Sequence, residues 1–172
     1  MKRVILLLSF LVFAMHSQAN ESVDERLANL GISLVEKGAP TANYVYAVKS
    51  GNLLFTAGHI PLDEQGQIIT GKLGEDLTTQ QGAAAARQAG VSLLSTIAEH
   101  LGGLDKVVRI VKVTGMVNAT ADYTEHSQVI NGFSDLMVEV FGEKGKHARS
   151  AVGMSSLPLN SAVEIEVIVE FE

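Results

Sequence analysis

The chain has 172 residues, of which 47% are hydrophobic and 19% are charged, and these values fit one folded domain and exclude an intrinsically disordered chain. It carries 19 Asp and Glu against 13 Lys and Arg, a formal net charge of -6, so we do not expect a general nucleic-acid binder. It has no cysteine, which excludes disulfides, thiolate catalysis and cysteine-based zinc sites.

Residues 1–19 have the pattern of a signal peptide. The positive stretch MKR is followed by the apolar run VILLLSFLVFAM, whose 12 residues are too few to span a bilayer comfortably. Ser17 and Ala19 then occupy the small positions of a signal-peptidase site, so we expect cleavage after Ala19. In a bacterial host the mature protein would be periplasmic or secreted, with no stable membrane span. An uncleaved N-terminal anchor is the alternative.

Residues 20–31 predict a short amphipathic helix that precedes the main domain. Ser22 and Glu25 stand at the spacing of a capping box, in which each side chain accepts a hydrogen bond from the other residue's backbone N–H. We therefore divide the chain into a signal peptide, an N-terminal extension helix and a main domain of residues 32–172.

The first part of the main domain predicts strands. A weak strand is expected at residues 32–36. Residues 44–63 favour a β-hairpin, because two apolar stretches flank a turn cluster that includes Gly51. Pro61 cannot donate a hydrogen bond to a neighbouring strand, so it should end the second strand of this hairpin.

Two helices and three strands are expected in the remainder. Thr78 and Gln81 form a second capping box, and apolar residues follow it at the helical period until Gly102 stops the helix. The later elements are a buried strand at 107–117, a helix at about 124–141, and two strands at about 149–157 and 161–171.

This order of elements neither alternates strictly nor separates strands from helices, and it predicts an α+β fold with two helices packed on one face of the sheet. The last strand supports the arrangement, because its apolar residues alternate with mostly acidic ones. A single sheet of this size leaves apolar surface on its other face, so we expect self-association.

The sequence gives little support for a metal site, a serine hydrolase or a phosphate-binding loop. The histidines of the mature chain show no ligand spacing such as H-x-x-x-H, so no metal site is expected; they are His59, His100, His126 and His147. GMSSL only superficially approaches the G-x-S-x-G of a serine hydrolase, and G-x-x-x-x-G-K-[ST] is absent.

Arg149 and Glu164 are the stronger candidates for a site. They lie on consecutive strands joined by a short turn, so a hairpin would bring the two strands together antiparallel. A guanidinium can bind a carboxylate at two points and a glutamate can hold a water, so the pair could anchor a small anion and direct a nucleophile at it. An ordinary cross-strand ion pair, worth about 0.2–1 kcal/mol, explains the same spacing.

The stretches YVYAVKSGNLLFTAGHIPLD and HARSAVGMSSLPLNSAVEIEVIV resemble the Rid family of reactive intermediate (imine) deaminases, also named endoribonuclease L-PSP-like proteins. The second stretch is the more specific, because it combines A-R-S, a Leu-Pro pair and V-E-I-E near the chain end. The resemblance covers about residues 32–171 and does not cover the predicted signal peptide, whose presence would make the chain an exported member. It implies a chorismate-mutase-like fold and a homotrimer with ligand clefts between subunits.

The resemblance also implies an activity, the hydrolysis of reactive enamines and imines of small carboxylates to 2-keto acids and ammonia without a cofactor. The chain would then be a hydrolase, a 2-iminobutanoate/2-iminopropanoate-type deaminase. Arg149 matches the family arginine that grips the substrate carboxylate, and Glu164 matches the glutamate that positions water. Tyr44 and Gly58 match cleft residues, and the Ala151 backbone N–H matches a donor to the bound carboxylate.

Several residues depart from the family pattern. Ala57 stands where many deaminating members have serine, and Ala151 replaces a frequent cysteine. His59 replaces the usual glutamine, either as a cleft residue or as a partly exposed turn histidine. Tyr44 has the alternative of core or cross-strand packing. Export would separate the protein from the cytoplasmic imines that this family clears, so another substrate, or none, is an alternative.

Three other functions stay open at this point. The first is a non-catalytic binder of small carboxylates that uses the same Arg149 side chain. The second is a ribonuclease, as the older family name suggests, although the acidic charge argues against it. The third is a chaperone-like trimer that acts outside the cytoplasm through its surfaces.

Overall fold

The computed structural model describes residues 21–36, 38, 40 and 42–172, so the predicted signal peptide and its cleavage site lie outside the described residues. Within this part no helix is long and apolar enough to cross a membrane. Three short 3-10 turns lie at Leu104–Lys106, Gly142–Gly145 and Pro158–Asn160. The other elements are, in chain order, α2 (Val23–Asn29), β1 (Ala47–Ser50), β2 (Leu53–Thr56), α3 (Thr79–Leu101), β3 (Val107–Asn118), α4 (His126–Phe141), β4 (Ala148–Met154) and β5 (Val163–Phe171).

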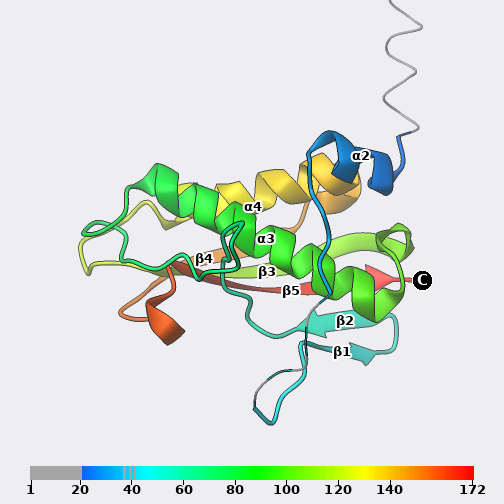
Figure 1. Ribbon diagram of the computed structural model, residues 1–172, viewed down its shortest axis with the longest axis horizontal. Helices are drawn as coiled ribbons and strands as arrows, with labels where there is room; N and C mark the ends of the chain where they lie inside the picture. The colour runs from blue at the N-terminus through cyan, green and yellow to red at the C-terminus, as the bar shows by residue number, and fades with distance from the viewer. Residues whose placement is uncertain (1–20, 37, 39, 41) are drawn as a thin grey trace, which may run out of the picture.

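The five strands form one mixed sheet in the order β1-β2-β5-β3-β4 (Figure 1). β3 pairs antiparallel with β5 and parallel with β4, because α4 carries the chain back between β3 and β4. The predicted antiparallel hairpin of the last two strands is therefore wrong, since β3 lies between them. The physical reason is burial: Val107, Ile110, Val113 and Val117 of β3 are almost completely buried, and such a strand is most stable inside a sheet.

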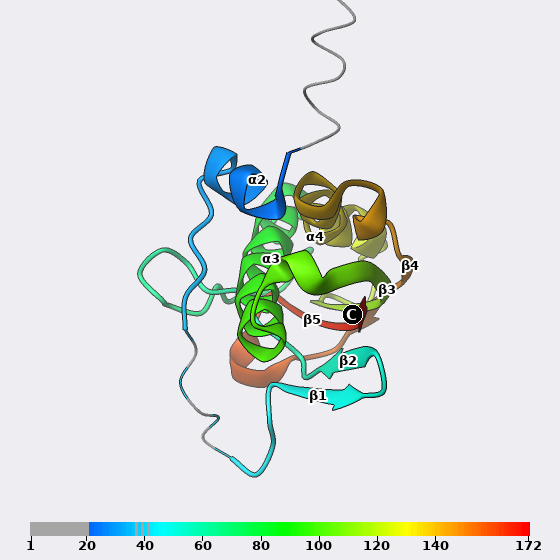
Figure 2. The ribbon, with the colours of Figure 1, turned by 90° about the vertical axis from the view of Figure 1, so that its right-hand side faces the viewer.

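α3 and α4 lie side by side on one face of the sheet, which confirms the predicted α+β arrangement (Figures 1 and 2). The hydrophobic core fills the space between these helices and the sheet. On β5 the side chains that point into the core are almost completely buried: Val163, Ile165, Val167 and Val169. The alternate residues of β5 point to the other face, which neither α3 nor α4 covers (Figure 2).

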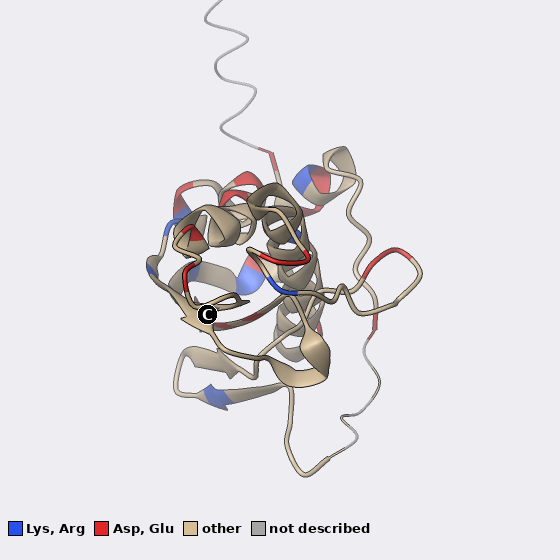
Figure 3. Ribbon diagram, turned by 90° about the vertical axis from the view of Figure 1, so that its left-hand side faces the viewer, with Lys and Arg blue, Asp and Glu red and all other residues tan. Residues whose placement is uncertain are grey.

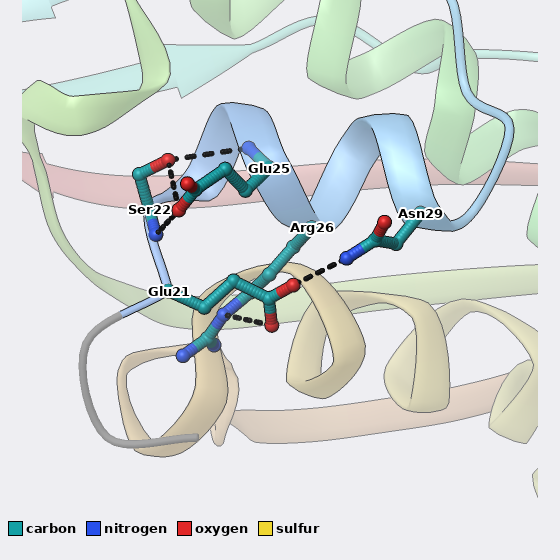
Figure 4. Close-up of polar contacts among 5 residues, drawn as sticks. All are labelled: Glu21, Ser22, Glu25, Arg26 and Asn29. Carbon is teal, nitrogen blue, oxygen red and sulfur yellow. Dashed lines mark hydrogen bonds and ion pairs between the residues drawn. The ribbon is translucent and has the colours of Figure 1, made fainter. Parts of the chain in front are cut away.

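Both predicted capping boxes are present. Ser22 Oγ accepts from the Glu25 N–H, and the Glu25 carboxylate accepts from the Ser22 N–H at 2.8 Å (Figure 4). Thr78 and Gln81 make the same exchange at the start of α3. α3 ends at Gly102, whose left-handed backbone conformation has a φ of 76°. The starts of these two helices could thus be predicted from pairs of residues three positions apart in the sequence.

The weak strand predicted at residues 32–36 does not form. This segment pairs with no strand of the described sheet and instead crosses α3 (Figure 1), where the Val35 N–H donates to the Ser95 hydroxyl at 3.2 Å. The hairpin is also shorter than predicted, because β2 ends at Thr56 rather than at Pro61. At residues 32–36 a contact with α3 takes the place of strand pairing, and in the hairpin the regular strand ends before Pro61.

α4 contacts α3 through backbone atoms at Gly132. A Cβ at this position would lie 1.9 Å from the Ala83 carbonyl oxygen. A backbone atom of α3 cannot move away unless the whole helix shifts, so a side chain on residue 132 would force the two helices apart.

Replacing Gly132 with alanine should therefore destabilise the protein by about 1–3 kcal/mol, because overpacking outweighs the roughly 1 kcal/mol that alanine normally gains over glycine in a helix. Urea denaturation followed by circular dichroism measures the change. Gln128→Ala, at an exposed position of the same helix, is the control and should stay within about 0.5 kcal/mol of the wild type. A Gly132→Ala protein as stable as the wild type would show that the helices do not touch here.

Candidate functional site

A hollow of about 680 Å³ opens where the start of β5 meets the loops that flank the β1–β2 hairpin. Segments distant in the sequence form it: the residues before β1, those after β2, Ser92 of α3, and the turn that leads into β5 with the start of that strand. Its wall includes the predicted cleft residues Tyr44, Gly58, His59 and Glu164, together with Tyr46, Ala57, Leu62, Pro158 and Leu159. The fold thus gathers most of the predicted site residues around one hollow.

Glu164 reaches this hollow from the uncovered face of the sheet. Two backbone hydrogen bonds between His59 and Ile165, of 2.8 and 3.0 Å, hold the loop after β2 against β5. Gly58 consequently lies against the Glu164 side chain, and a Cβ on Gly58 would be 1.9 Å from Glu164 Oε1. A residue without a side chain is therefore required at Gly58 if the carboxyl is to keep its position.

The surroundings of the Glu164 carboxyl favour its protonated form. Burial raises its pKa above the usual 4.5, and the neighbouring Glu166 carboxylate raises it further. A carboxyl whose pKa is moved toward neutral pH can both accept and return a proton, which is the property that a general acid–base residue needs.

Tyr44 stands at the open side of the hollow. It precedes β1 instead of lying within the hairpin, and it is 51% exposed. Its ring packs edge-on against Tyr46, with the ring centroids 5.9 Å apart. This placement argues against core or cross-strand packing and leaves the Tyr44 ring accessible to a ligand.

His59 forms part of the wall but is engaged inside the protein. It is only 3% exposed, its Nδ1 lies 2.8 Å from the Ala57 carbonyl oxygen, and its Nε2 lies 2.7 Å from the Thr96 hydroxyl. The carbonyl can only accept, so Nδ1 carries the hydrogen, while Nε2 makes a hydrogen bond with the Thr96 hydroxyl, which also donates to the Ser92 carbonyl oxygen at 3.4 Å. The Nδ1 contact stays within the loop after β2 and the Nε2 contact ties that loop to α3, which favours a structural role over ligand contact.

Arg149 lies elsewhere, on the edge strand β4, and its guanidinium turns toward α4. Nη1 donates to Asn131 Oδ1 at 2.9 Å and to Ser134 Oγ at 3.0 Å, and Nη2 donates to the Ser127 carbonyl oxygen at 3.4 Å. Ala151, two residues along the same strand, faces the same side. No carboxylate forms an ion pair with Arg149 among the residues that the structure describes.

Arg149 and Glu164 face opposite sides of the sheet within one chain. Val113 of β3 pairs with Arg149 on one side and with Val167 on the other, so these three side chains share a face. Glu164 is three residues from Val167 on a strand whose side chains alternate, and it therefore points to the other face. The convergence expected from a hairpin does not occur within one chain, because β3 separates the two strands.

The chain thus presents two half-sites, and we use these names below. The glutamate half-site is the hollow with Tyr44, Gly58 and Glu164. The arginine half-site is the helix-facing side of β4 with Arg149 and Ala151. Neither half-site contains both a carboxylate anchor and an acid–base group.

Sequence reasoning missed the residues of α4 that hold the guanidinium. Asn131 and Ser134 are polar and three positions apart, a spacing that puts both on one side of a helix. That spacing was the only sequence signal for a shared polar contact of Asn131 and Ser134. Nothing in the sequence, however, shows that this side of α4 faces β4.

No metal centre accompanies either half-site. In the described part of the chain, no three His, Cys, Asp or Glu side chains gather closely enough to hold an ion. A second hollow, of about 790 Å³, lies between the segment before β1 and α3, and a third, of about 590 Å³, lies near the start of α4. The wall of the third hollow includes Gly153 and His126, where a Cβ on the glycine would lie 2.3 Å from the imidazole Nε2, but no carboxyl takes part in that contact.

Comparison with known proteins shows which sequences this chain is similar to. A family model described as "YjgF/chorismate mutase-like, putative endoribonuclease" matches residues 24–171, which include both half-sites. Protein TCP17 of Trypanosoma cruzi is 44% identical over 153 residues, which make up 88% of this chain and 96% of that protein.

Solved structures of other proteins have a backbone fold similar to that of this chain. The Agrobacterium tumefaciens protein Atu1372 superposes with a TM-score of 0.80 at 41% identity, over 87% of this chain and 94% of its own. RidA from the Antarctic bacterium Psychrobacter superposes with a TM-score of 0.54 at 26% identity, over 77% of this chain and 92% of its own. The chain is therefore nearer in backbone to Atu1372 than to RidA.

The raised pKa of Glu164 leads to a prediction about stability. A carboxyl whose pKa in the folded state lies above 4.5 lowers stability as the pH rises from about 4.5 through that raised pKa, because the unfolded chain releases its proton first. Glutamine has nearly the same shape and no charge to bury. Glu164→Gln should therefore have a higher Tm than the wild type at about pH 7 and an equal Tm at about pH 4.

Thermal unfolding across this pH range measures the difference. Glu172→Gln removes one carboxylate from an exposed position near the same strand and serves as the control. A Glu164→Gln protein less stable than the wild type at neutral pH would mean that its surroundings stabilise the ionised carboxylate.

Proposed function

Because this chain belongs to the YjgF/chorismate mutase-like family, we propose that it hydrolyses reactive imines and enamines of small carboxylates to 2-keto acids and ammonia. The observation that supports this most directly is the Glu164 carboxyl, which lies against Gly58 in a ligand-sized hollow with its pKa raised. Arg149, which has no carboxylate partner among the described residues, supplies the group that a substrate carboxylate needs.

The proposed chemistry needs no reactant other than water. An enamine first tautomerises to its imine, whose carbon is electrophilic. Water adds to the carbon of the protonated imine while the Glu164 carboxylate takes one of the water protons, and a neutral carbinolamine forms. Glu164 then returns that proton to the nitrogen. As the C–N bond breaks, the hydroxyl group gives its proton to Glu164 and becomes the keto oxygen, and the released ammonia takes this proton and leaves as ammonium with the 2-keto acid. Arg149 would hold the carboxylate throughout, with the Ala151 N–H as a second donor.

The complete site in this proposal combines half-sites from two neighbouring chains. The arginine half-site lies on an edge strand and the glutamate half-site on the uncovered sheet face, so a head-to-tail contact can join them, and three such contacts close a ring. A strip of exposed apolar side chains on the uncovered face supports burial against another copy. It includes Val48, Phe55 and Val152, which are 55%, 40% and 41% exposed.

RNA is a poor substrate for such a surface. Lys and Arg lie scattered over separate elements of the described chain (Figure 3), and the formal net charge is -6. A surface of this kind lacks the row of cations that follows a phosphate backbone. We therefore propose a small anionic substrate and not a nucleic acid.

The proposal places this activity outside the cytoplasm, after removal of the signal peptide. The supporting observation is the SxA ending of the apolar N-terminal run. Expression of the full chain in a bacterial host should give a periplasmic protein whose N-terminal residue is Asn20, as determined by Edman sequencing. Recovery of a protein that begins at Met1 would show that the segment is not cleaved.

The purified mature protein should release ammonia from freshly generated 2-iminopropanoate. Glu164→Gln should lower the rate about 10²–10⁴-fold, the usual contribution of a positioned general acid–base group. Binding of a 2-keto acid, measured by titration calorimetry, should survive in Glu164→Gln and disappear in Arg149→Ala. A wild type that binds the 2-keto acid but releases no ammonia would instead be a non-catalytic carboxylate binder.

Mixing the two variants tests whether the site is shared between chains. Co-expressed Arg149→Ala and Glu164→Gln chains should recover about one quarter of wild-type activity, since random pairing gives that fraction of interfaces with both native residues. If one chain supplied both groups, each site would keep one defect and the mixture would be as inactive as either variant. Each variant assembled alone is the control.

A further inference from the structure

We propose that Asn131, Ser134 and His147 form an uncharged brace that positions Arg149 and leaves its positive charge to a ligand carboxylate. The inference rests on the proposed role of Arg149 as the carboxylate anchor. It assigns a positioning role to Asn131 and Ser134, which lie outside the family stretches quoted above, and to His147, the first residue of the second stretch. The brace spans α4 and the turn before β4.

The brace occupies one nitrogen of the guanidinium completely. Nη1 has two hydrogens, which go to Asn131 Oδ1 at 2.9 Å and to Ser134 Oγ at 3.0 Å. Nη2 directs one hydrogen to the Ser127 carbonyl oxygen at 3.4 Å. The Nε–H and the second Nη2 hydrogen are not used by the brace, and arginine can grip a carboxylate at two points through this edge.

His147 sets the direction of the Ser134 hydroxyl. Its Nδ1 lies 2.6 Å from the Gly145 carbonyl oxygen, which can only accept, so Nδ1 carries the hydrogen. Nε2 of the neutral ring then accepts from Ser134 Oγ at 3.0 Å, and the oxygen lone pairs are left to receive Arg149. Burial lowers the pKa of His147, the hydrogen bond to the Gly145 carbonyl opposes this, and the Arg149 charge adds to the lowering, so the net effect favours the neutral ring.

The absence of charge in the brace is its distinguishing feature. The other arginines of the described chain all have a glutamate partner: Arg26 lies 3.8 Å from Glu21, Arg87 lies 2.7 Å from Glu139, and Arg109 lies 3.9 Å from Glu170.

Arg149 has instead an amide, a hydroxyl and a carbonyl. An aspartate would fit the position of Asn131, because the two side chains have the same shape. The brace thus fixes the guanidinium without neutralising it, which is the state in which it binds an anion most strongly.

Asn131→Asp separates this role from a structural one. The substitution preserves the contact to Arg149 and adds an ion pair, so the Tm should not fall. Binding of 2-oxobutanoate, measured by titration calorimetry, should weaken about 10- to 100-fold, because the new carboxylate competes for the same guanidinium. In the imine hydrolysis assay KM should rise by a similar factor while kcat changes little.

Ser134 gives the second arm of the experiment. Ser134→Ala should raise the Kd for 2-oxobutanoate about 3- to 10-fold, and Ser134→Thr, which restores the hydroxyl, should recover most of that loss. Ser127→Ala is the matched control, since Ser127 contacts Arg149 only through its backbone carbonyl. Its affinity should equal that of the wild type.

Three results separate the possible failures. An Asn131→Asp protein that binds 2-oxobutanoate as tightly as the wild type, or a Ser134→Thr protein no better than Ser134→Ala, would overturn the brace alone. A wild type that binds no 2-oxobutanoate would overturn the brace together with the proposed role of Arg149. A wild type that binds but releases no ammonia would overturn the proposed hydrolysis and leave the brace supported by the binding data.

Discussion

The position of β3 inside the sheet is the constraint on which the rest of the structure depends. It pairs with β5 on one side and with β4 on the other, and α4 makes the second pairing parallel. Because β3 separates the last two strands, Arg149 and Glu164 turn to opposite faces. One strand pairing therefore determines that the chain carries two half-sites.

The two half-sites hold their ionisable groups in opposite electrostatic settings. Glu164 is partly removed from water and lies near Glu166, so its surroundings disfavour the charged form. Arg149 keeps its charge among uncharged acceptors that satisfy its hydrogens without an ion pair. Each setting is unfavourable or neutral for the stability of one chain. In the proposed function, each would become useful when a carboxylate ligand and a water lie between the two groups.

Local elements followed from residue chemistry alone. Ser22 with Glu25 and Thr78 with Gln81 marked two helix starts, because a capping box depends only on residues three positions apart. The strand predicted at 32–36 failed for the opposite reason. Its residues suit a strand, but a strand needs a partner, and this segment lies over α3 instead of beside the sheet.

The sequence by itself determined the α+β class and the main helices and strands, and it singled out Tyr44, Gly58 and Glu164 of the glutamate half-site, since alternation, capping and a recognisable motif are local properties of the chain. Only the tertiary structure decided that β3 stands between β4 and β5, that His59 is bound to Thr96, and that α4 offers Asn131 and Ser134 to Arg149. These contacts join residues far apart in the chain, and burial of the whole sheet, not any short segment, selects them.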